Sequence, residues 1–194
     1  MEADWEIEIG GHAPVIDACW SGFVDLRSAP EKAAFQLTEV VEFSALGSAL
    51  ATFNASDSSF VTVKCDIWPV DTTDLIDPIE FDAPIESAVH GLACYIDLLR
   101  RDAELWTDPQ VVIGWCKRVC SALQASSLRC CRSDLVIRSA VGAGGQSAIG
   151  VTAYGAACGP TKEAAKASLA LAVKVLAQCI QSTESGNDEP LKLQ

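Results

Sequence analysis

The segment LRCCRSDLVIR, residues Leu128–Arg138, has the pattern of a β-strand with two unlike faces. Side chains along a strand point alternately to opposite faces of the sheet. One face of this strand would carry Cys131, Leu135 and Ile137, and the other would carry Cys130, Arg132, Asp134, Val136 and Arg138. The sequence therefore predicts a strand that packs its apolar face on a core and leaves a charged face outside.

A second segment, Phe60–Trp68, has the same alternation. Its predicted inward side chains are Val61, Val63, Cys65 and Ile67, and its predicted outward side chains are Thr62, Lys64, Asp66 and Trp68. Both segments place a cation two residues before an aspartate on the outward face. In both, the sequence Ser-Ala-Leu precedes the strand, at residues 48–50 and 121–123. An internal pseudo-duplication is one interpretation of this likeness.

The remaining strands are predicted at residues 5–9, 15–26 and 149–158, the first two as a hairpin. A long helix is predicted over residues 28–54, starting with a capping box formed by Ser28 and Glu31. Gly47 in this helix is expected to mark close packing on the sheet, because glycine weakens a helix interior by about 1 kcal/mol relative to alanine.

Three further helices are predicted from caps and apolar spacing. The first follows Asp82 and Pro84, with the apolar positions Ile85, Val89, Leu92, Ile96 and Leu99, and closes on Arg100 and Arg101. The second starts at Asp108, and its apolar face is Val112, Trp115, Cys116, Val119, Cys120 and Leu123. The last starts at residues 159–161, with the stripe Leu169, Val173, Leu176 and Ile180.

Strands and helices do not alternate strictly in this order, which favours an α+β fold over a doubly wound parallel sheet. We predict about five strands in a mostly antiparallel sheet, with four helices packed mainly on one face. Residues 1–182 would form a single domain, and residues 183–194 would be a disordered tail.

The 194 residues carry a formal net charge of −12, with a pI near 4.5. Phosphate binding depends on lysine and arginine, so this balance argues against nucleic acid as a partner. The first residues show no export signal, and no apolar run reaches the length of a membrane span. Nine cysteines without an export signal predict reduced thiols in the cytoplasm.

Four thiolates suffice for a tetrahedral zinc site, and Cys116 and Cys120 are followed shortly by Cys130 and Cys131. Adjacent residues of a regular strand point to opposite faces, and the chain has no Cys-x-x-Cys pair, so no metal or cofactor is predicted. The two histidines, His12 and His90, and the many carboxylates single out no catalytic residue. The sequence therefore leaves open whether the protein is an enzyme.

The outward face of the sheet is the predicted functional surface. Its candidate ligand- or partner-binding residues are Lys64, Asp66, Trp68, Arg132, Asp134, Arg138 and Tyr154. Arginine beside an aromatic ring can hold a planar or anionic ligand. The same charges could instead form a cross-strand salt-bridge ladder, or be covered by a second subunit.

These observations favour a non-catalytic module with an acidic surface that binds protein, as a homo-oligomer or with a basic partner. The acidic segment 71–82 would steer a cationic partner toward it. The alternative is a small-molecule enzyme or ligand-binding protein that uses the charged face. That alternative predicts a hollow on this face and a perturbed ionisable group near it.

Overall fold

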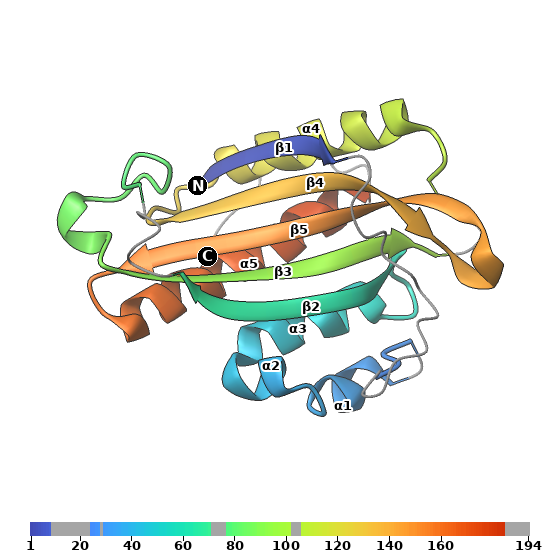
Figure 1. Ribbon diagram of the computed structural model, residues 1–194, viewed down its shortest axis with the longest axis horizontal. Helices are drawn as coiled ribbons and strands as arrows, with labels where there is room; N and C mark the ends of the chain where they lie inside the picture. The colour runs from blue at the N-terminus through green and yellow to red at the C-terminus, as the bar shows by residue number, and fades with distance from the viewer. Residues whose placement is uncertain (9–23, 28, 71–76, 102–105, 185–194) are drawn as a thin grey trace.

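A single five-stranded sheet forms the front of the molecule, and helices lie behind it (Figure 1). The computed structural model describes residues 1–8, 24–27, 29–70, 77–101 and 106–184. The strands are β1 (Glu2–Glu8), β2 (Phe60–Val70), β3 (His90–Arg100), β4 (Cys131–Val141) and β5 (Ser147–Gly159). They lie in the order β1-β4-β5-β3-β2.

Three of the four strand pairs are antiparallel, and only the pair of β1 with β4 is parallel. The predicted α+β class with a mostly antiparallel sheet is therefore confirmed. This parallel pair places β1, the first of the described strands in the sequence, at the edge of the sheet beside β4, the fourth.

The described helices are α1 (Pro30–Ala34), α2 (Thr38–Glu42), α3 (Ser44–Asn54), α4 (Pro109–Gln124) and α5 (Lys162–Glu184), with two 3-10 turns, η1 (Ile85–Ser87) and η3 (Ala143–Gly145). Helix α5 packs against β5 and β3, α4 against β1 and β4, and α3 against β2. The main core lies between this helix layer and the sheet, around Trp115, Leu98 and Leu169.

Helices α4 and α5 were predicted correctly. Asp108 caps α4, and its side chain accepts a hydrogen bond from the Gln110 N–H at 2.8 Å. All six side chains of the predicted apolar face of α4 are buried. In α5 the predicted stripe is buried as well, and the Thr161 hydroxyl accepts from the Ala164 N–H at 3.1 Å.

The predicted helix over residues 28–54 is instead three short helices, α1, α2 and α3. Phe43 interrupts the path with φ −142° and ψ 88°, values far from the helical region. Its side chain is buried at 2% exposure, so the core fixes this break. Gly47 does mark a close approach, but to Val40 of α2 rather than to the sheet.

The predicted helix over residues 85–99 is wrong: only η1 is helical, and strand β3 follows from His90. The same segment that fits a helical spacing also has an apolar residue at every second position: Leu92, Cys94, Ile96 and Leu98. The side chains of these four residues face the helix layer. Asp82 does not cap a helix; it has φ +45° and ends a turn, donating its backbone N–H to the Ile79 carbonyl.

Strand β2 departs from the predicted alternation. Phe60 and Thr62 face the helices, whereas Val61 and Val63 lie on the other face in an apolar cluster with Leu99. A β-bulge between Thr62 and Cys65 shifts the register by one residue, so Cys65 and Ile67 return to the helix side. The inward assignment of Val61 and Val63 is therefore wrong, and that of Cys65 and Ile67 is right.

Two predictions fall mainly outside the described residues. The predicted strand 15–26 is described only for residues 24–26, which are not in a strand. The predicted tail 183–194 is described only through Glu184, which still belongs to α5 and pairs with Arg100.

The central strands have an approximate two-fold relation. The successions α3-β2-β3 and α4-β4-β5 have the same order, and β3 and β5 lie side by side in the middle of the sheet. In Figure 1 the outer strands β2 and β4 flank this central pair on opposite sides. This arrangement supports the predicted pseudo-duplication, which stays a prediction.

Candidate functional site

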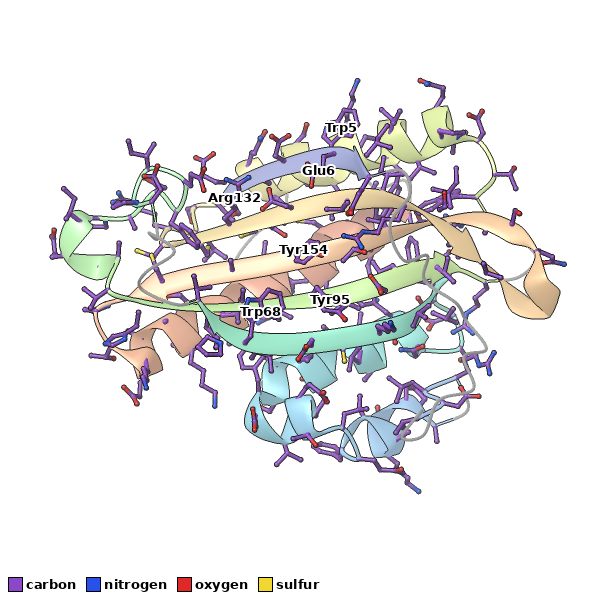
Figure 2. All side chains as sticks on the ribbon, viewed as in Figure 1. Trp5, Glu6, Trp68, Tyr95, Arg132 and Tyr154 are labelled. Atoms are coloured by element: carbon purple, nitrogen blue, oxygen red, sulfur yellow. The ribbon has the colours of Figure 1, made fainter. Side chains whose placement is uncertain are left out.

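A row of polar and aromatic residues crosses all five strands on the face opposite the helices. The registers place Asp4 beside Asp134, Asp134 beside Tyr154, Tyr154 beside Tyr95, and Tyr95 beside Asp66. Two aspartates thus flank a central tyrosine pair in symmetric positions. Figure 2 shows Glu6, Arg132, Tyr154, Tyr95 and Trp68 distributed across this face from β1 to β2.

A groove of about 440 Å³ lies along the row. It is lined by side chains and backbone from all five strands: Asp4, Trp5, Glu6, Trp68, Val70, Ala93, Arg132, Asp134, Val136, Arg138, Tyr154, Gly155 and Ala156. The small residues Ala93, Gly155 and Ala156 form its floor between larger neighbours. This volume falls within the range of small-molecule sites, which is roughly 300–1,000 Å³.

Three aromatic rings form a continuous series beside the groove. The centroids of Trp68 and Tyr95 are 6.1 Å apart, and those of Tyr95 and Tyr154 are 5.8 Å apart, both with tilted planes. Trp68 keeps 36% of its surface exposed. Burial, with the Asp97 charge as a second cause, raises the pKa of Tyr95 to about 12, so its phenol is neutral.

Both groove arginines are held by carboxylates of this molecule. The Arg132 Nε donates to Asp134 Oδ2 at 2.7 Å, and its Nη1 lies 3.3 Å from Glu80 Oε2. Arg138 Nη2 lies 2.6 Å from Glu8 Oε2 and donates to the Tyr154 hydroxyl at 3.2 Å. Part of the predicted salt-bridge ladder therefore exists, within β4 and between β4 and β1.

Two polar atoms of the groove residues are buried without a hydrogen bond among the described residues. They are the second carboxylate oxygen of Asp134, Oδ1, and the Nε of Arg138. One is an acceptor and the other is a donor. Leaving such groups unpaired costs about 1–3 kcal/mol each. Both atoms are covered by protein rather than open to the groove.

A buried carboxylate lies on the same face near Tyr95. Asp97 is 7% exposed, and its Oδ1 accepts a 2.5 Å hydrogen bond from the Thr152 hydroxyl. Burial raises the pKa of Asp97, although this hydrogen bond and the charges of Arg138 and Lys64 oppose the shift.

The groove is bounded at both ends of the face. Toward the bulge lies the apolar cluster Val61, Val63, Leu99, Ala140 and Ala148. At the opposite end the segment 77–88 folds against the sheet. There Phe81 packs on Cys158, and Arg129 pairs with Asp82 at 2.9 Å. The face predicted to mix charged side chains with Val136 and Trp68 is therefore polar mainly in its middle, and apolar clusters lie at both ends.

Of the seven predicted site residues, Trp68, Arg132, Asp134, Arg138 and Tyr154 line the groove. Asp66 lies in the same row, and Lys64 is exposed at the bulge.

Sequence reasoning missed Tyr95 and Asp97, because the segment that carries them was interpreted as a helix. It also left Asp4 out of the site. The alternation from Leu92 to Leu98 was the signal that could have placed Tyr95 and Asp97 on this face.

The four cysteines considered for zinc are divided between two apolar regions. Cys116, Cys120 and Cys131 belong to the main core, where burial raises their thiol pKa values to about 12, 12 and 11. Cys130 has φ +59° and lies beside Cys158, whose N–H donates to the Cys130 carbonyl at 2.9 Å. The described residues contain no group of three or more histidine, cysteine, aspartate or glutamate side chains arranged to hold a metal.

Comparisons with protein-family models, curated proteins and solved structures gave no match to this chain. Among the described residues, no helix has both the length and the apolar character needed to cross a membrane.

Proposed function

We propose that the protein is a ligand-binding domain whose site is the groove across the middle of the sheet, and that the ligand is a small organic molecule. The observation that carries the proposal is the groove itself, with the rings of Trp68 and Tyr154 on its walls. Aromatic walls with a few placed polar groups are typical of small-molecule sites. The carboxylates of Asp4 and Glu6, which also line the groove, would give such a ligand its polar contacts.

A thermal-shift screen of small aromatic fragments tests this proposal. Ala156→Phe would place a ring in the groove floor, and Val111→Phe adds the same ring to the exposed surface of α4, where Val111 is 55% exposed. Fragments that raise the melting temperature of the wild type and of Val111→Phe, but not of Ala156→Phe, are the expected result. Fragments that stabilise all three proteins equally would place binding outside the groove and contradict the proposal.

Self-association is the second candidate function, and exposed apolar side chains beside the groove favour it. Ile79 and Ile85, on the segment that closes one end of the face, are 85% and 81% exposed. Large aliphatic side chains exposed to this extent on one segment are typical of interaction surfaces. We expect a homo-oligomer in light scattering, and a monomer after the double change Ile79→Ser and Ile85→Ser. A wild-type protein that is already monomeric at high concentration would remove this candidate.

Steering of a basic protein partner by the acidic segment has less support. Glu80 and Asp82 of that segment already pair with Arg132 and Arg129. Asp71 and Asp74 lie outside the described residues. A reducing compartment such as the cytoplasm remains part of the proposal, and it is supported by the free thiols of the eight described cysteines.

A further inference from the structure

We infer that the ligand of the groove is a small organic cation, a protonated amine carried on a flat or aromatic body. This inference rests on the proposed function and narrows it to one chemical class. Three features of the groove lead to this inference. Arg132 and Arg138 already bind carboxylates of the protein, whereas Asp4 and Glu6 form no ion pair among the described residues, and the rings of Trp68 and Tyr154 belong to the lining.

The arginines offer little to an anionic ligand. Arg132 already holds two carboxylates, and Arg138 holds the Glu8 carboxylate and the Tyr154 hydroxyl. A ligand carboxylate or phosphate would have to share each guanidinium with a carboxylate that is already bound to it. The two anions would repel each other, so the net gain in free energy is small.

The carboxylates of Asp4 and Glu6, on β1, are still available to bind a cationic ligand. No lysine or arginine of the described residues forms an ion pair with Asp4 or Glu6, which line the groove, or with Asp66, which lies in the same row. Asp4 also faces Asp134 directly across β1 and β4. Arg132 already pairs with Asp134, so Asp4 is the carboxylate of this pair that is left for a ligand cation.

The rings add a second attraction for positive charge. The face of an aromatic ring is the negative part of its quadrupole, and a cation over Trp or Tyr gains about 0.5–2 kcal/mol. Trp68 and Tyr154 border the groove on the side away from Asp4 and Glu6. An amine bound between the two walls would therefore contact carboxylates on one side and ring faces on the other.

The charge of the whole chain acts in the same direction. The net charge of −12 would raise the local concentration of any cation. A flat amine therefore suits the carboxylates and rings of the groove as well as the charge of the chain.

Three probes of similar shape separate charge from shape: tyramine is the cation, para-ethylphenol the neutral compound and para-hydroxyphenylpropionate the anion. Their affinities are measured by NMR titration at low salt and again at about 1 M salt, where the Debye length falls to about 3 Å. We expect tyramine to bind about tenfold more tightly than para-ethylphenol, as cation–π and carboxylate contacts predict. The anion is expected to bind most weakly, and the preference for tyramine is expected to shrink at high salt.

The double change Asp4→Asn and Glu6→Gln should remove most of the preference for tyramine while para-ethylphenol still binds. Glu163→Gln is the matched control, because Glu163 is exposed in the first turn of α5, away from the groove. Binding of para-ethylphenol or the anion as tightly as tyramine would overturn the inference and leave the proposed function standing. Failure of all three probes to bind in the groove would overturn both.

Discussion

Gly47 shows how one missing side chain determines the packing of α2 on α3. A Cβ atom at this position would lie 2.6 Å from Val40 Cγ1. The side chain of Val40 is β-branched, stiff and 2% exposed, so it cannot move aside. Position 47 therefore needs glycine, although glycine has a low helix propensity.

We expect Gly47→Ala to destabilise the protein by about 1–3 kcal/mol, although alanine is normally the better helix residue. Gly114→Ala in α4 is the matched control. Its added Cβ would meet only Arg118 Nη1 at 3.7 Å, so this change should stabilise by up to about 1 kcal/mol. The free energies come from urea unfolding. In the Val40→Ala background most of the cost of Gly47→Ala should disappear, and equal costs in both backgrounds would contradict this account.

Asp97 should make stability depend on pH. Burial raises its pKa in the folded protein, so between the unfolded value near 3.8 and the folded value the folded state binds more protons. The contribution of Asp97 to the free energy of unfolding is therefore fully present at low pH, and it is lost as the pH rises through that window.

Asp97→Asn removes the titrating group but keeps an oxygen that can accept the Thr152 hydrogen bond. We expect the unfolding free energy of this variant, relative to the wild type, to increase with pH across the window. Thr152→Val should raise the pKa of Asp97 further, as measured by NMR, because the hydrogen bond favours the charged carboxylate. If the unfolding free energy of Asp97→Asn relative to the wild type fell as the pH rose, the pKa of Asp97 would be lowered by folding rather than raised.

Among the elements, β3 marks the limit of what periodicity alone can decide. Residues 85–99 fit a helical spacing and a strand alternation at the same time, and short apolar runs are ambiguous in this way. The competing signal was the predicted cap, Asp82 before Pro84. Only the fold shows that this turn leads into the centre of a sheet.

Long amphipathic helices and strands with one-sided charge were predictable. Helices α4 and α5 and strand β4 each carry a clear period. Strand β4 supplies four of the groove residues, and three of them, Arg132, Asp134 and Arg138, were predicted site residues. The bulge in β2 was not predictable, because apolar side chains occupy both faces of the strand before Lys64: Phe60 on one face, and Val61 and Val63 on the other. The pairing of β1 with β4 joins segments more than a hundred residues apart, so no local pattern could indicate it.

Arg101 ties the end of β3 to the end of α3. Its guanidinium donates to the carbonyls of Asn54, Ala55 and Ser58, at 3.1, 2.6 and 2.6 Å. Arg100 and Arg101 were expected to close a helix of their own. Arg101 instead satisfies carbonyl groups at and just after the carboxyl end of α3, where a cation is also favourable for the helix dipole.

We expect Arg101→Met to destabilise the protein by about 2 kcal/mol, since hydrogen bonds from a charged group contribute roughly 1.5–3 kcal/mol. Arg118→Met in α4 is the control. Arg118 donates one exposed hydrogen bond to the Gly114 carbonyl, and its loss should change stability by no more than about 0.5 kcal/mol. Chemical denaturation measures both, and similar costs for the two variants would show that Arg101 does not hold the two elements together.

At the scale of the whole molecule, one face of the sheet packs on the core and the other face carries the groove. Helices cover the first face, while apolar clusters close both ends of the second and leave a groove between them. The two-fold arrangement of β2-β3 and β4-β5 puts tyrosines at the centre and aspartates on either side. The groove thus follows from the topology of the sheet, and its chemistry follows from the residues on two pairs of strands.

Intermolecular nuclear Overhauser effects between the protein and bound tyramine would locate the small-molecule site that we propose in the groove. We expect cross-peaks from the ligand ring to the side chains of Trp68, Tyr154 and Ala156. Cross-peaks to Phe35 and Ala51, which line a separate hollow behind the sheet between α1 and α3, would instead place the ligand outside the groove and refute the proposal.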